Sequence, residues 1–137
     1  MNRKVLIGLG VVLLAAAGYG AYIYFKKAER VMSGQAAYSM TTSQLLSAFE
    51  QNEDSANKKY LNQIIEVTGN IESISPDSLG TNILLGTDNP MAGVNCRFDK
   101  EVSEKIKNLK ANDSIKLKGQ CTGFNLDVNL SRCDLLK

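Results

Sequence analysis

The sequence has no histidine and no tryptophan, and it has only three cysteines in 137 residues. Without histidine, the chain lacks the commonest general base and the commonest metal ligand of proteins. The cysteines, at positions 96, 121 and 133, do not form a Cys-x-x-Cys pair, so neither a zinc ribbon nor a thioredoxin-type site is indicated. We therefore expect no metal site and no cofactor.

The acidic residues show no catalytic pattern either. Four aspartates lie in or next to predicted turns, where an aspartate usually accepts hydrogen bonds from the backbone. These are Asp88, Asp99, Asp113 and Asp127. Arg97 follows Cys96 directly, but neighbours in a strand point to opposite faces, so the cation would not activate the thiol. The sequence predicts a protein that is not an enzyme, with no catalytic residues.

Charged residues are also missing from residues 5–25, VLIGLGVVLLAAAGYGAYIYF. This run of about 21 residues would rise roughly 31 Å as a helix, which matches the hydrocarbon core of a bilayer. Aromatic residues gather at its end, and Lys26 and Lys27 follow, as in a membrane helix with an aromatic belt. The aromatic residues are Tyr19, Tyr22, Tyr24 and Phe25. We predict an N-terminal transmembrane anchor with basic flanks over residues 1–27.

A cleaved signal peptide is the alternative interpretation of this segment. Ala15, Ala16 and Ala17 are small enough for a cleavage site, but the apolar run continues beyond them to Phe25. The region also has no cysteine for lipid attachment. An uncleaved anchor is therefore favoured. Its orientation stays open, because the basic residues on the two flanks are nearly balanced.

The remaining residues, 31–137, differ from the whole chain in charge. The whole chain has 16 basic and 14 acidic residues, but five basic residues and one acidic residue lie before residue 31. That leaves 11 basic and 13 acidic residues, a net charge of −2, on a soluble part of about 100 residues, which is enough for one core. The excess of positive charge lies at the flanks of the anchor, where it suits anionic lipid headgroups.

The soluble part begins with a predicted linker at 28–40 and a helical segment at 41–62. Thr41 and Gln44 fit a capping box at the start of that helical segment. From residue 63 onward the apolar residues alternate with polar ones, which is typical of half-buried strands. The predicted strands are 65–72, 81–86, 94–99, 115–121 and 126–135, with a turn at 75–80 and a helix at 100–109.

This order, β-β-β-α-β-β, is that of the OB-fold, a five-stranded Greek-key barrel with a helix between its third and fourth strands. Gly69 and Gly119 lie in the middle of predicted strands, where glycine allows the sharp bends of a small barrel. We predict a mainly β domain over residues 63–137, preceded by a transmembrane helix and a short amphipathic helix.

The three cysteines leave two interpretations open. One is a disulfide with one free thiol, in an oxidising compartment, with Cys121–Cys133 as the first pairing and Cys96–Cys133 as the second. The other is three buried, unpaired thiols that pack as small hydrophobic groups.

The region from residue 60 to 136 resembles the tRNA_anti-like family of bacterial OB-fold proteins. The resemblance rests on three stretches: IEVTGNI at 65–71, VNCRF at 94–98, and KGQCTG at 118–123 followed by DVNL at 127–130 and Cys133. It implies a membrane-anchored or lipoprotein-like protein of the cell envelope, with its soluble domain outside the cytoplasm. The family name implies kinship with anticodon-binding domains.

The sequence has few of the residues that a binding site for nucleic acid needs. Single-strand binders need a basic groove and exposed aromatic residues on the second and third strands. The second strand has no aromatic residue, and Phe98 on the third is in phase with the buried residues Val94 and Cys96. Phe124 in the last loop, with Arg97, Lys116 and Lys118, is the remaining candidate, and a hydrophobic lid is the simpler role for Phe124.

We therefore predict a membrane-anchored binding or interaction module, with a single-stranded nucleic-acid binder at the cytoplasmic face as the alternative. Its expected partners are the bilayer and another envelope protein, a small ligand or an oligosaccharide. The candidate contacts lie in two loops, with three cations nearby. These residues are Asp88, Asn89, Met91, Phe124, Asn125, Arg97, Lys116 and Lys118.

Overall fold

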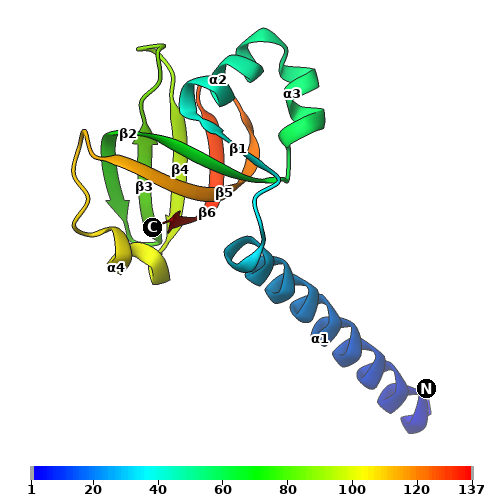
Figure 1. The fold of residues 1–137 in the computed structure, drawn as a ribbon. Helices are drawn as coiled ribbons and strands as arrows, with labels where there is room; N and C mark the ends of the chain where they lie inside the picture. The colour runs from blue at the N-terminus through cyan, green and yellow to red at the C-terminus, as the bar shows by residue number, and fades with distance from the viewer. Residues whose placement is uncertain (1, 137) are drawn as a thin grey trace.

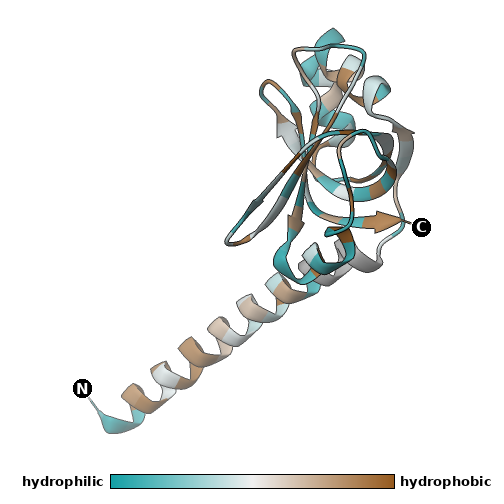
Figure 2. Ribbon diagram, turned by 90° about the vertical axis from the view of Figure 1, so that its left-hand side faces the viewer, coloured by the Kyte–Doolittle hydropathy of each residue, from teal (hydrophilic) through white to brown (hydrophobic). Residues whose placement is uncertain are grey.

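The computed structural model of the chain describes residues 2–136, with side chains for residues 2–26 and 34–136. It consists of one long helix, α1 (Arg3–Ser33), that projects from a compact domain of strands and short helices (Figure 1). Within α1, the 24-residue stretch Arg3–Lys26 is long and apolar enough to cross a membrane, and none of it is buried. Figure 2 shows the apolar residues of α1 along most of its length, away from the domain.

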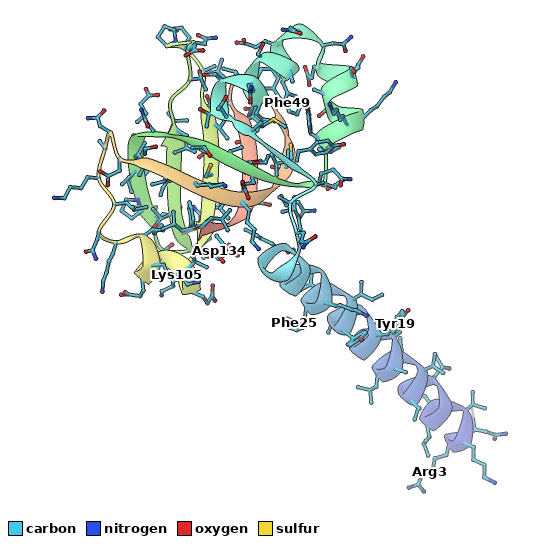
Figure 3. All side chains as sticks on the ribbon, viewed as in Figure 1. Arg3, Tyr19, Phe25, Phe49, Lys105 and Asp134 are labelled. Carbon is cyan, nitrogen blue, oxygen red and sulfur yellow. The ribbon has the colours of Figure 1, made fainter. Side chains whose placement is uncertain are left out.

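The helix α1 extends further than the sequence pattern predicts. It continues to Ser33, because residues 27–32 are mostly good helix formers, and only residues 34–37 separate it from strand β1 (Tyr38–Thr41). Much of the linker predicted at 28–40 therefore has regular structure. Figure 3 shows Tyr19 and Phe25 on the part of α1 that stands clear of the domain.

The domain is a closed five-stranded barrel, as predicted. Its strands are β2 (Ile64–Asp77), β3 (Gly80–Leu85), β4 (Val94–Asp99), β5 (Ser114–Phe124) and β6 (Val128–Leu136). They pair in the order β2-β3-β4-β6-β5, and β5 pairs back to β2. The 3-10 helix η1 (Lys100–Val102) and helix α4 (Ser103–Ile106) lie between β4 and β5, which completes the OB-fold order.

Several boundaries differ from the predicted ones. Strand β2 runs on to Asp77, whose carboxylate accepts backbone hydrogen bonds from Leu79 (2.8 Å) and Gly80 (3.0 Å), so the turn begins only after it. Strand β5 continues to Phe124, and β6 begins at Val128, because the two strands pair across Phe124 and Val128. The helical stretch after β4 ends at Ile106 rather than 109.

Strand β1 was not predicted, and it covers an exposed edge. The first half of β2 pairs with β5 on one side, while β3 pairs only with the second half. Strand β1 pairs in parallel with Ile65–Thr68 and takes over the edge that β3 leaves free. A free strand edge is a template for unwanted pairing, so this short strand protects it.

Both ends of the barrel are covered by helices. Helix α2 (Thr42–Gln51) inserts Leu45, Leu46 and Phe49 at one end, and helix α3 (Glu53–Tyr60) follows it. Figure 3 places Phe49 between α2 and the strands. At the other end, Val102 and Ile106 are buried beneath η1 and α4. The capping box predicted for α2 is confirmed: Thr41 Oγ1 accepts from the Gln44 N–H at 3.3 Å, and Gln44 Oε1 accepts from the Thr41 N–H at 3.0 Å.

The start of α2 is held on the barrel by Thr42. Its side chain is buried and donates a hydrogen bond to the Gly86 carbonyl at 2.8 Å. A Cβ on Gly69 would lie 2.6 Å from Thr42 Cγ2, so the helix can sit this close only over a glycine. The pairing of β2 with β5 is regular through Gly69, so the bend predicted there is not present. The glycine is needed instead because Thr42 of α2 packs directly against it. At Gly119 the predicted irregularity is present, because the β5–β6 register shifts between Lys118 and Gln120.

The three cysteines are buried free thiols in this structure. The Cys121–Cys133 disulfide, which the sequence left open as the first pairing, is not present here and stays a hypothesis. Cys121 pairs with Leu130, whereas the Cys133 sulfur lies next to Gly119, where a Cβ would be only 2.6 Å away. The other expectation, that the cysteine-bearing strands form the core, is confirmed by exposures of 0% for Cys96, 0% for Cys121 and 1% for Cys133.

We expect a Gly69→Ala substitution to lower the free energy of unfolding by about 1–3 kcal/mol, because the added methyl group collides with Thr42. Gly86→Ala is the matched control, since the nearest atom to its Cβ would be an ordinary 3.7 Å away. Chemical denaturation of the two variants measures the difference. A Gly69→Ala loss no larger than that of Gly86→Ala would contradict the close packing of α2 on β2, and Thr42→Ala should restore part of the loss.

Candidate binding surfaces

The predicted contact residues of the two loops lie at the same end of the barrel. The β3–β4 loop and the β5–β6 hairpin are joined by hydrogen bonds from the Gly93 N–H to Asp127 Oδ1 (2.8 Å) and from the Val128 N–H to the Gly93 carbonyl (3.1 Å). Helix α2 covers the same end (Figure 1). The two predicted contact loops are therefore neighbours in space, although they are far apart in the chain.

Phe124 and Asn125 line a groove between α3 and the β5–β6 hairpin, which we call the hairpin groove. Its volume is about 420 Å³. The lining residues are Asn57, Leu61, Thr122, Gly123, Phe124, Asn125 and Asn129. None of them carries a charge, so the groove offers amide groups, a hydroxyl and an apolar surface, but nothing that attracts a phosphate.

Phe124 forms part of this groove and also covers the core. Its ring lies 5.6 Å from that of Phe49 between centroids, at an interplanar angle of 31°, and the side chain is half-buried. The predicted role of Phe124 as a hydrophobic lid agrees with this packing. One side of the Phe124 ring thus packs against Phe49, and the rest of the ring lines the groove.

The asparagines of the groove are partly held by each other. Asn129 Nδ2 donates to Asn125 Oδ1 at 3.3 Å, and Asn95 Nδ2 donates to Asn129 Oδ1 at 3.4 Å. Among the described residues, the Asn57 side chain and the Asn125 amide nitrogen have no hydrogen-bond partner in the protein. The groove therefore combines positioned amides with free donors and acceptors. This is a suitable surface for a ligand that is rich in hydrogen-bonding groups but uncharged.

Sequence reasoning missed Asn57, Asn95 and Asn129. Side chains alternate between the two faces of a strand, so Asn129 faces away from the barrel interior that Val128 and Leu130 face. The alternation of apolar and polar residues along 127–130 could therefore have identified Asn129 as an outward-facing residue. Asn57 gave no such signal, because the contact between α3 and the hairpin is tertiary.

Asp88 and Asn89 line a second, smaller groove between α2 and the β3–β4 loop, of about 310 Å³. Here the polar groups hold the loop on the helix: the Asp88 N–H donates to Ser43 Oγ at 3.1 Å, and Asn89 Nδ2 donates to Glu50 Oε1 at 2.6 Å. Met91 lies at the loop tip with 78% of its surface exposed. The structure thus gives the side chain of Asn89 a structural contact and leaves Met91 open to solvent.

The three predicted cations lie elsewhere, and each has a partner within the domain. Arg97 on β4 forms a two-pronged ion pair with Asp77, with Nη2 3.0 Å from Oδ1. Lys116 Nζ lies 2.7 Å from Glu66 Oε1, and Lys118 Nζ donates to the Gly34 carbonyl at 3.2 Å. These three cations therefore do not form, around Phe124, the basic cluster that would bind the phosphate groups of a nucleic acid.

These pairings shift the pKa of the carboxyl partners. The hydrogen bond from Arg97, followed by the one from the Leu79 backbone, lowers the pKa of Asp77 to about 2. The Lys116 hydrogen bond, followed by that from Ser39, lowers the pKa of Glu66. Asp77 therefore stays ionised at any pH above about 4, and the contacts of Glu66 favour its ionised form as well.

No group of three or more histidine, cysteine or acidic side chains that could hold a metal ion occurs in the described part of the chain. The prediction that the protein is not an enzyme stays a prediction.

We expect the Asp77–Arg97 pair to contribute to acid stability. The folded pKa of Asp77 lies below its ordinary value of 3.8, so its contribution is complete above that pH and is lost as the pH falls toward 2. Asp77→Asn should therefore reduce the fall in melting temperature between pH 4 and pH 2. Melting curves across this range measure it, and the double variant with Arg97→Gln should behave like Asp77→Asn. An identical pH dependence in the wild type and Asp77→Asn would show that the ion pair does not stabilise the fold.

Solved structures with a similar fold come from diverse proteins. A "putative nucleic acid-binding lipoprotein" from Klebsiella pneumoniae is 18% identical, with a TM-score of 0.62, and the match covers 80% of this chain and 97% of the other. The Schizosaccharomyces pombe Stn1–Ten1 complex matches at 16% identity and a TM-score of 0.43, over 54% of this chain and 58% of the other. An OBody bound to hen egg-white lysozyme matches at 11% identity and a TM-score of 0.46, over 58% and 86%.

At these identities the likeness shows the fold alone. No curated protein matches the sequence. The family comparison is more specific, because one family model matches residues 1–135, nearly the whole chain. This match confirms the resemblance seen in the sequence: the chain belongs to the tRNA_anti-like family of OB-fold domains.

Proposed function

We propose that this protein is a membrane-anchored OB-fold binding module of the bacterial cell envelope. Its hairpin groove takes an uncharged ligand rich in hydroxyl groups, such as an oligosaccharide. The observation that carries the ligand class is the lining of the groove, which has three asparagines, a threonine and part of the Phe124 ring but no charged residue. OB-folds as a class bind oligonucleotides and oligosaccharides, and an uncharged groove favours the second.

The exposed apolar surface of α1 supports the membrane anchor. Leu13 and Leu14 are 66% and 75% exposed, and the large apolar side chains along the rest of the helix are similarly open. A surface of this kind is unfavourable in water and is typical of a membrane-contacting segment. Lys26 Nζ lies 5.5 Å from the centre of the Tyr22 ring, as in an interfacial belt that ends the apolar segment.

The domain side of this junction is polar. The Arg132 guanidinium lies 5.7 Å from the Tyr24 ring centre, and Lys118 reaches the Gly34 carbonyl just after α1. The barrel thus meets the helix where the headgroups of a membrane would lie. The description of the Klebsiella protein, which has a similar fold, as a "lipoprotein" supports an envelope location.

Binding of single-stranded nucleic acid is the second candidate. The observation that favours it is the description of that same Klebsiella protein as nucleic acid-binding. Against it stand the partners of Arg97, Lys116 and Lys118 within the domain and the burial of Phe98, which removes the aromatic platform from the β3–β4 face.

The anchor is tested by placing charge in the middle of α1. Leu13→Arg with Ala16→Arg should release the protein into the soluble fraction, because each arginine costs about 2.5–3.5 kcal/mol at the centre of a membrane helix. The wild type and a Leu13→Phe control should stay in the membrane pellet after alkaline carbonate washing. Extraction of the wild type by carbonate would contradict a spanning helix.

The ligand class is tested by titrating the full chain in detergent with chitotetraose, maltotetraose and a deoxythymidine oligonucleotide. We expect binding of a neutral sugar, weakened about tenfold by Asn57→Ala or Phe124→Leu, which is roughly 1.4 kcal/mol for a lost contact. Asn82→Ala is the matched control, because Asn82 is a half-buried amide on β3, outside the groove.

Two results would contradict this proposal. Salt-dependent binding of the oligonucleotide alone, weakened by Lys116→Gln and Lys118→Gln, would establish the second candidate. A sugar affinity that Asn57→Ala and Phe124→Leu leave unchanged would place the ligand at another surface.

A further inference from the structure

Arg132 on β6 has a backbone conformation that is unusual for its residue type. Its φ of +51° lies in the left-handed region, and the other two non-glycine residues with a positive φ among residues 2–136 are asparagines, Asn62 and Asn112. Asparagine is several-fold enriched in this region of backbone conformation, whereas arginine is not. A strained residue persists only where the surrounding structure fixes it, and such residues gather at functional sites.

The strain at Arg132 belongs to a β-bulge between β5 and β6. A step of two residues on β5, from 118 to 120, matches a step of three on β6, from 131 to 134, so Gly119 alone faces Arg132 and Cys133. Two residues opposite one define a bulge, which bends a strand and redirects a side chain. Arg132 therefore stays on the outer face together with the residue before it, and Cys133 returns to the interior.

The bulge turns Arg132 toward the membrane helix. Its guanidinium carbon lies 5.7 Å from the centre of the Tyr24 ring, two residues before the end of the apolar span at Lys26. From the neighbouring strand, Lys118 Nζ donates to the Gly34 carbonyl at 3.2 Å, directly after α1. Strand β6 thus lies beside the domain end of α1 (Figure 1), and two cations of the barrel point to this junction.

The contact with Tyr24 leaves the hydrogen-bond donors of Arg132 available. An aromatic ring attracts a cation through its π face and, unlike a carboxylate, offers it no charged acceptor. Among the described side chains, no carboxylate forms an ion pair with Arg132, whereas Arg97 and Lys116 each have one. The planar fork of a guanidinium matches two oxygens of a phosphate. At the depth of an aromatic belt, the phosphate within reach is that of a lipid headgroup.

We propose that Arg132 is the centre of a binding site for the phosphate of an anionic phospholipid, at the junction of α1 and the barrel. The proposal rests on the membrane anchor proposed above and is independent of the ligand of the hairpin groove. Arg132 binds the phosphate oxygens, and Lys118 adds positive charge beside them while it keeps its bond to Gly34. A lipid with a choline group is disfavoured, because these cations repel the choline. The bound lipid fixes the barrel against the membrane surface.

The site is tested with the full chain in detergent. The protein is mixed with equal amounts of phosphatidylglycerol and phosphatidylcholine that have the same acyl chains, and native mass spectrometry counts the lipids that stay bound. The wild type should prefer phosphatidylglycerol. Arg132→Asn should reduce this preference about fivefold, the effect of one cation at an anionic membrane surface. Asparagine accepts the left-handed conformation, so this variant keeps the bulge.

Lys110→Asn is the matched control for charge. It removes one positive charge from an exposed residue in the loop between α4 and β5, on the other side of the barrel from α1 (Figure 1), and should leave the lipid preference unchanged. A second pair of variants tests the site even if Arg132→Asn fails to fold. Tyr24→Leu should lower the preference, because the ring holds the guanidinium, whereas Tyr22→Leu, on another face of the helix, should not.

Three results would overturn the proposal. These are an equal affinity of the wild type for the two lipids, a loss in Lys110→Asn as large as in Arg132→Asn, and displacement of the bound lipid by an excess of inorganic phosphate. The last result would mean that the site binds free phosphate instead of a lipid. Carbonate washing of membranes that hold the same proteins keeps this test separate from that of the anchor. Wild type and variants that stay in the pellet retain the anchor, whatever their lipid preference.

Discussion

The double pairing of strand β2 is the constraint on which the rest of the domain depends. With fourteen residues it is the longest strand, and it pairs with β5 through Ile64–Asn70 and with β3 through Ile71–Asp77. A strand that pairs with both ends of a sheet turns the sheet into a barrel. The register shift between Ile71 and Ser73 marks the point where it passes from one partner to the other. The interior that this closure creates is then sealed by α2 at one end and by η1 and α4 at the other.

The covering of the barrel end by α2 and α3 also creates the candidate site. Because Phe49 packs over the barrel, Phe124 has an apolar partner on one side and faces the hairpin groove on the other. Leu61, just after α3, completes the apolar part, and the asparagines surround it. The same packing that stabilises the core therefore shapes a groove whose chemistry is neutral.

Three cations on the strands have partners within the domain. Arg97 and Lys116 form ion pairs with carboxylates, and Lys118 donates to a backbone carbonyl. The lowered pKa values of Asp77 and Glu66 agree with these contacts, which favour the ionised forms. A phosphate backbone would have to compete with these partners. This competition is one reason for which we propose a neutral ligand.

The sequence alone determined the features that depend on local pattern. The apolar run predicts the long helix, the alternation of Val94, Cys96 and Phe98 predicts buried side chains, and Thr41 with Gln44 predicts the start of α2; each is confirmed. Strand β1, the partners of Arg97 and Lys118, and the approach of Asn57 to the hairpin were not predictable. Each of these is a contact between residues distant in the chain, decided by the geometry of barrel closure. The cysteines show the same division. Alternation places Cys96 and Cys121 in the core, but Cys133 is out of phase with Val128 and Leu130, and its burial follows from the irregular backbone at Arg132, which has a φ of +51°.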